Sequence, residues 1–189
     1  MARERFAYQS TIPIECVAPT DVQNQIGLDN TTYGATCSFK VYDPAKDEVL
    51  SSAEASGQTI LSVTSSGVFV VGDQVELTQD DGSLRVSTVS AIDAAAGTIT
   101  IDDVTTDTSA AGNRVRVKLG ATVTMTEFGT PKLEERNWGF RGFLASTHAG
   151  LEPDLDIDVE ISFVGAGGNL DLLLVICATV VLVDSCGDC

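Results

Sequence analysis

Residues 57–117 constrain the fold more than any other part of the chain, because they form a run of short predicted strands joined by tight turns. Apolar and polar residues alternate here, which places Val75 and Leu77 on one face of a strand and Glu76 on the other. Asp81-Gly82 supplies the positive φ angles that a tight hairpin requires. The segment predicts a small β-module that presents surface and carries no evident chemistry.

Longer strands are predicted on both sides of this module. One covers residues 36–42, is closed by a turn at Asp43-Pro44, and turns Cys37, Phe39 and Val41 inward. The strands predicted after the module cover residues 115–128, 138–146, 155–164 and 170–183.

The predicted fold class is therefore all-β, with minimal helix. Residues 1–56 are expected to form an N-terminal arm and the first strands of an antiparallel β-sandwich or barrel. Residues 57–117 form an inserted small, hairpin-rich β-barrel module. Residues 118–189 supply the remaining strands of the main domain and a cysteine-bearing tail.

The chain is strongly acidic, with 27 acidic against 11 basic residues and a formal net charge of −16. Such a field repels phosphate backbones, so sequence-specific binding of nucleic acid is not expected. The acidity suits solubility, a basic protein partner, or a surface past which DNA slides without sticking.

No membrane association is predicted either. The longest apolar run, residues 172–183, covers 12 residues, well short of the ~20 that span a bilayer. The first residues lack the apolar core of a secretory signal, so synthesis in a cytoplasm is expected.

Acidic residues alternate with apolar ones near the start of one predicted strand, at Asp154, Asp156, Asp158 and Glu160. Carboxylates on one strand face lie about 6.6–7 Å apart, so they bind a cation only if neighbouring strands help. The favoured interpretation is an acidic strand edge that faces solvent or a partner. A metal site at Asp154, Asp156 and Asp158 is the weaker alternative.

His148 is the only histidine, so histidine-dependent catalysis would rest on this residue alone. It occupies a predicted strand end before a turn, where a surface loop histidine is expected. No nucleophile elbow, phosphate loop or metalloprotease helix is visible. The sequence therefore predicts a protein without catalytic residues or cofactor.

The chain contains five cysteines, of which Cys37 and Cys177 are expected in the core among apolar neighbours. Cys16, Cys186 and Cys189 lie in more polar surroundings near the ends of the sequence. They are candidates for disulfides between subunits, formed once a particle reaches an oxidising medium. Free thiols without a role are the alternative.

Three aromatic residues and an arginine cluster within residues 137–143. Trp138, Phe140 and Arg141 are candidate anchors of a protein interface, where Trp and Arg are favoured. A core strand whose glycines allow close backbone approach explains the same segment equally well.

About a third of the chain resembles the small β-modules of virion proteins from tailed bacteriophages. The residues that carry this resemblance are Ile60, Val63, Phe69, Gly72-Asp73, Val75, Leu77, Asp81-Gly82, Val89, Ile92-Asp93 and Gly97–Ile101. Similar turn-rich patterns occur in bacterial surface proteins, so an adhesin-like binding module is the alternative.

The resemblance implies a non-enzymatic virion subunit that decorates or links the capsid shell or belongs to the neck. Its expected partners are other virion proteins, namely capsid or neck subunits, and copies of itself. Strand addition and extended arms hold such subunits together, and residues 3–19 would suit an arm. Five cysteines exceed what this family leads us to expect.

Overall fold

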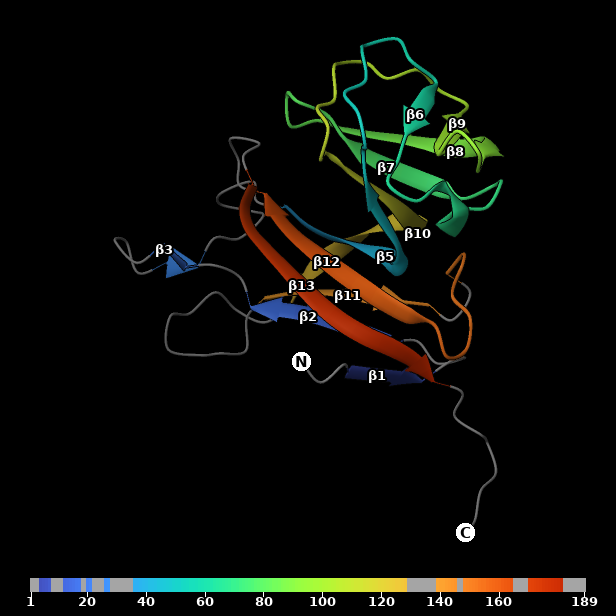
Figure 1. Cartoon of the computed structure of the whole chain (residues 1–189). Helices are drawn as coiled ribbons and strands as arrows, with labels where there is room; N and C mark the ends of the chain where they lie inside the picture. Colours follow the sequence, from blue (N-terminus) through green and yellow to red (C-terminus); the bar gives the residue numbers. More distant parts are fainter. Residues whose placement is uncertain are drawn as a thin grey trace, which may run out of the picture. The chain divides into compact units, whose positions relative to one another are not determined.

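The computed structural model describes residues 4–7, 12–17, 20–21, 26–27, 36–128, 139–145, 148–164 and 170–181. These residues form β-strands and one short 3-10 helix, η1 (Ser66–Val68), so the predicted all-β fold class is confirmed (Figure 1). The strands are β1 (Glu4–Ala7), β2 (Ile12–Val17), β3 (Thr20–Asp21), β4 (Ile26–Gly27), β5 (Thr36–Val49), β6 (Ile60–Ser62), β7 (Gln74–Thr78), β8 (Leu84–Asp93), β9 (Thr98–Ile101), β10 (Arg114–Phe128), β11 (Gly139–Leu144), β12 (Asp156–Val164) and β13 (Leu170–Val181).

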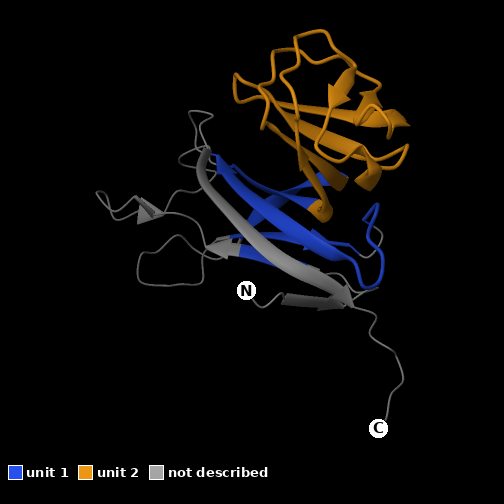
Figure 2. Ribbon diagram, viewed as in Figure 1, with its two compact units in different colours: residues 1–41, 120–189 blue, residues 42–119 orange. Residues whose placement is uncertain are grey.

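The chain divides into two compact units (Figure 2). Unit 1 comprises residues 1–41 and 120–189, and unit 2 is Tyr42–Leu119. Unit 2 thus interrupts the sequence of unit 1. The long strands β5 and β10 each begin in one unit and end in the other, so unit 2 includes strand residues on both sides of the expected module at 57–117.

Unit 1 is built from two groups of strands that face one another. One group has the order β1-β13-β12-β5, and the other pairs β10 with β11 and β11 with β2. β5 and β10 are themselves neighbours, so both groups belong to one continuous sheet. β13 pairs antiparallel with β12, and β11 pairs antiparallel with both β10 and β2, whereas β1 pairs parallel with β13. Phe140 of β11 packs edge-on against Phe163 of β12, with 5.6 Å between the ring centroids. These rings join the two layers.

The core of unit 1 also confirms the predicted inward face of β5. Cys37, Phe39 and Val41 are all buried. The Cys37 thiol lies 3.4 Å from the Met125 sulfur of β10, and the Phe39 ring lies against Gly142 of β11. Alternate residues of β5 thus fill the space between the layers.

The turn predicted at Asp43-Pro44 is wrong, because β5 continues through these residues to Val49. Asp43 Oδ1 accepts a hydrogen bond from the Ala45 amide at 2.9 Å, the kind of local bond that elsewhere starts a turn. Here the bond lies within a strand, and Asp43 is buried. Cross-strand pairing has overridden the local turn signal.

Unit 2 contains the predicted hairpins, in the strand order β10-β7-β8-β9-β6. Gly82, with φ of 82°, turns β7 into β8, and Gly97, with φ of 69°, turns β8 into β9. The ladder does not close continuously. Instead, the Ser51 amide donates to the Ser62 carbonyl at 2.9 Å and the Thr64 amide donates to the Val49 carbonyl at 3.0 Å. These bonds bring the end of β5 alongside β6.

Candidate functional site

The acidic strand predicted at residues 154–160 is β12, and its interpretation as a sheet edge is wrong. β12 lies between β13 and β5 and is therefore an interior strand. Ile157, Val159, Ile161 and Phe163 are buried, while Asp156 is exposed and Asp158 and Glu160 are partly exposed on the opposite face. Asp154 precedes the strand with a left-handed φ of 62°.

These carboxylates do not assemble into a cation site. Across the residues that the structure describes, no group of three or more His, Cys, Asp or Glu side chains is arranged to hold a metal ion. The weaker alternative proposed for Asp154, Asp156 and Asp158 thus gains no geometric support. Asp156 and Asp158 are kept apart by the regular spacing of the strand, and Asp154 lies before the strand begins.

His148 lies in a turn after β11, as expected for a loop histidine. Its amide donates to the Ala145 carbonyl at 2.9 Å, and its carbonyl accepts from the Leu151 amide at 3.2 Å. The ring packs closely on Gly120, where an added Cβ would lie 2.7 Å from His148 Nε2. Gly120 has φ of 61°, so both its conformation and its neighbour favour glycine.

The aromatic segment divides into core and surface. Trp138 lies outside the described residues, and Phe140 is buried against Phe163, so within one copy its ring belongs to the core. Arg141 is partly exposed, and its Nε donates to Glu15 Oε1 of β2 at 2.6 Å. The exposed aromatic of β11 is Phe143, at 53% exposure, which the sequence analysis did not single out.

The cysteines proposed to cross-link subunits fall mostly outside the described residues. Cys186 and Cys189 lie there entirely, and for Cys16 the structure describes only the backbone of β2, paired with Phe140. Cys37 is buried, as expected for a core residue, and its thiol lies 3.4 Å from the Met125 sulfur. Among the five cysteines, Cys37 alone has a described side chain, so the proposed cross-links stay a prediction.

A buried charged cluster in unit 2 was missed by sequence analysis. Glu76 of β7 is 1% exposed, and its Oε1 accepts hydrogen bonds from the Tyr42 hydroxyl at 2.6 Å and from Arg116 at 3.0 Å. The Arg116 guanidinium also lies 3.8 Å from the centroid of the Tyr42 ring. The arrangement pairs a buried anion with a buried cation stacked on an aromatic ring. Tyr42, Glu76 and Arg116 are all buried, so the cluster lies inside unit 2.

A second polar cluster joins the β7–β8 turn to the segment before β10. Asp80 Oδ1 accepts from the Ala110 amide at 2.8 Å and from Asn113 at 2.9 Å, and Oδ2 accepts from the Thr108 hydroxyl at 2.9 Å. These hydrogen bonds, that from Ala110 foremost, hold the pKa of Asp80 below its ordinary value of 3.8. The carboxylate therefore ties two loops together in its ionised form.

Substitution of Asp80 by asparagine tests whether these hydrogen bonds to the carboxylate stabilise the protein, through the pH dependence of the stability. Because the folded pKa is depressed, the stabilisation is present above about pH 4 and is lost as the pH falls through the folded value. We expect D80N to unfold at a lower temperature than the unsubstituted chain at pH 7, with a smaller difference at pH 3. D102N, at an exposed carboxylate of the same unit, is the control. A difference that does not change with pH would contradict the assignment.

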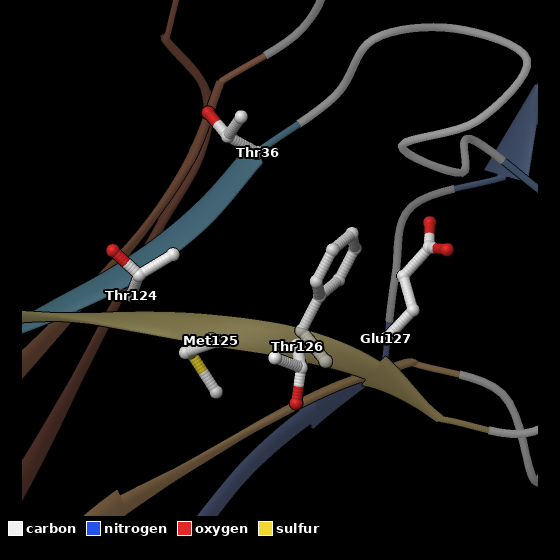
Figure 3. Close-up of a pocket in the computed structure, with 6 residues that line it drawn as sticks. Thr36, Thr124, Met125, Thr126 and Glu127 are labelled. Carbon is white, nitrogen blue, oxygen red and sulfur yellow. The ribbon is translucent and has the colours of Figure 1, made fainter.

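A small hollow lies in unit 1 beside the end of β10 (Figure 3). It has a volume of about 280 Å³ and is lined by Thr36, Thr124–Glu127 and Phe140. In Figure 3 Thr36 stands at the start of β5, while Met125 extends from the opposite side of the β10 ribbon to Glu127. Its size is slightly below that of typical small-molecule pockets, and its lining combines threonines, two apolar side chains and the carboxylate of Glu127. This chemistry selects no particular ligand.

Comparison with known proteins leaves the family open. Neither a protein-family model nor the sequence of a curated protein matches this chain. In the part of the chain that the structure describes, no helix is long and apolar enough to cross a membrane. The assignment of function therefore depends on the residues and geometry described above.

Proposed function

We propose that this chain is a non-enzymatic structural subunit of a tailed-bacteriophage virion, which decorates or links the capsid shell or forms part of the neck. Its partners in this proposal are capsid or neck subunits and further copies of itself. The supporting observation is the way in which the N-terminal residues are bound. Glu4–Ala7 and Ile12–Val17 are both held as added strands.

Strand addition suits an assembly subunit because the main-chain hydrogen bonds that provide the affinity form with few constraints on the side chains of the added strand. β1 lies outermost on β13, and β2 pairs only with β11 among the described strands. Ile14 anchors β2 through a side chain that is 2% exposed. The same chemistry that holds these strands would hold an arm on a neighbouring subunit.

The charge supports a role at the particle surface or at a DNA passage. A net charge of −16 opposes adhesion to DNA. A protein that lines a DNA passage or forms part of the shell must avoid such adhesion. The inserted unit 2 presents acidic turns at Asp80-Asp81 and Asp102-Asp103, all exposed. We place the protein in the virion, after synthesis in the cytoplasm of the infected bacterium.

The direct test is to locate the chain in purified particles. We expect mass spectrometry of density-purified virions to detect it at a fixed ratio to the major capsid protein, and immunogold labelling to place it on the head or neck. An adhesin-like module would instead appear on the envelope of uninfected cells. Detection there, with none in purified particles, would overturn the proposal.

Disulfides between neighbouring subunits are a further part of this proposal, at Cys16, Cys186 and Cys189. Particles released into an oxidising medium are expected to give multimer bands on gels without reductant and monomer bands with it. Serine substitution at these three positions should remove the multimer bands. C37S is the matched control, because Cys37 is buried. Monomer bands alone in both gels would refute the cross-links.

A further inference from the structure

One outer face of unit 1 combines exposed apolar groups with almost no net charge. Arg141 of β11 pairs with Thr126 of β10 on one side and with Glu15 of β2 on the other. In the adjacent row Phe143 pairs with Pro13. Residues opposite one another in an antiparallel pair project from the same face, so these side chains form one surface. We call it the β11 face, consisting of Pro13, Glu15, Thr124, Thr126, Arg141 and Phe143.

Exposure confirms that this face points outward. Phe143 is 53% exposed, and Pro13, Glu15, Thr124 and Thr126 are also exposed. The residues between them along the strands, Ile14, Phe140, Gly142 and Leu144, are buried. An exposed aromatic beside a proline and an arginine has the composition of an interface centre.

The charge on this face favours a second copy of the chain as its partner. The two charged groups of the face, Arg141 and Glu15, neutralise each other through a 2.6 Å hydrogen bond. The outward face of β12, in contrast, carries Asp156, Asp158 and Glu160. Two copies of a chain with a net charge of −16 repel each other, and the repulsion is smallest where the approaching surfaces are locally neutral.

We propose that the β11 face is the surface through which two copies of this chain associate. A two-fold axis reverses the row in the second copy, so Arg141 of one copy approaches Glu15 of the other, and the two Phe143 rings cover each other and Pro13. The inference follows from the surface alone and does not depend on the virion assignment.

The association is expected to be weak in dilute solution. Three strands span only about 15 Å, so the buried area stays below that of a stable dimer. A dissociation constant of roughly 10 µM to 1 mM is expected for a contact of this class. Such a contact becomes effective where many copies are held side by side.

Sedimentation equilibrium of the full chain, in reductant and from about 10 µM to 1 mM, tests the proposal. We expect the unsubstituted chain to approach a dimer at the highest concentrations. F143E should remain monomeric, because a two-fold contact contains this side chain twice and its dissociation constant should rise roughly 100-fold. V71E is the matched control, since Val71 is 63% exposed in unit 2 and receives the same charge.

The ion pair between Arg141 and Glu15 allows a second test, which does not depend on Phe143. R141E should weaken association, and the exchanged pair E15R/R141E should restore it. A monomeric unsubstituted chain throughout the range would overturn the proposal. Equal weakening by F143E and V71E would do so as well, as would an exchanged pair no stronger than R141E.

Discussion

Replacement of Glu76 by leucine is expected to lower the free energy of unfolding of unit 2 by about 3 kcal/mol, because it removes one partner of a buried ion pair. Glu76 is 1% exposed and Arg116 is 8% exposed, so water cannot replace the lost carboxylate around the guanidinium. The Tyr42 hydroxyl loses its acceptor at 2.6 Å in the same step. The loss of free energy is large because the Arg116 guanidinium and the Tyr42 hydroxyl stay buried without the carboxylate that they bind.

Two matched variants separate the charge from the hydrogen bond. Y42F removes only the hydroxyl donor and leaves the ion pair, so a loss of about 1 kcal/mol is expected. E76L/R116M removes both charges and should recover most of the loss caused by E76L. Calorimetry of the full chain measures all three variants against the unsubstituted protein. If E76L costs no more than Y42F, the ion pair does not stabilise the unit.

The position of Glu76 also shows where sequence reasoning ends. Alternation correctly placed Val75 and Leu77 on one buried face and Glu76 on the other. It did not indicate that this second face is also covered. The covering residues, Tyr42 and Arg116, are separated from Glu76 by 34 and 40 positions. Alternation with a period of two shows which residues share a face of the strand. Whether the polar face is buried depends on strands that are distant in the sequence.

Local patterns predicted the strands and hairpins well because their causes are local. Gly82 and Gly97 have the positive φ angles that their turns require. The Asp43-Pro44 signal failed because the same local preferences were outweighed by strand pairing over the length of β5. The acidic strand was misplaced at an edge for a related reason. Its neighbour β5 begins more than a hundred residues earlier in the chain.

The candidate interface illustrates the same limit. The sequence drew attention to residues 137–143, and the structure places Phe140 in the core and Phe143 on the surface. Residues 140 and 143 project from opposite faces of one strand, and no local signal states which face is covered. The partner of Arg141 is Glu15, 126 positions away, which no spacing rule would connect.

Gly142 in β11 is predicted to tolerate no side chain. A Cβ built there would lie 2.8 Å from Phe39 Cε1 and 3.0 Å from Met125 Cγ. The Phe39 ring is itself fully buried between the layers, so it cannot move away freely. We expect G142A to cost roughly 2 kcal/mol and G142V roughly 3 kcal/mol through overpacking of the core.

The matched control is G67A, because no heavy atom lies within 4 Å of a Cβ at Gly67 and its backbone is not left-handed. Its expected cost is about 0.5 kcal/mol or less. Chemical denaturation of each variant provides the comparison. Combining G142A with F39L removes the ring atom that the new methyl group meets. The double variant should therefore lose less free energy of unfolding than the two single variants lose together. Full additivity would mean that the strain lies elsewhere, and that the close approach of β11 to β5 does not determine the choice of glycine.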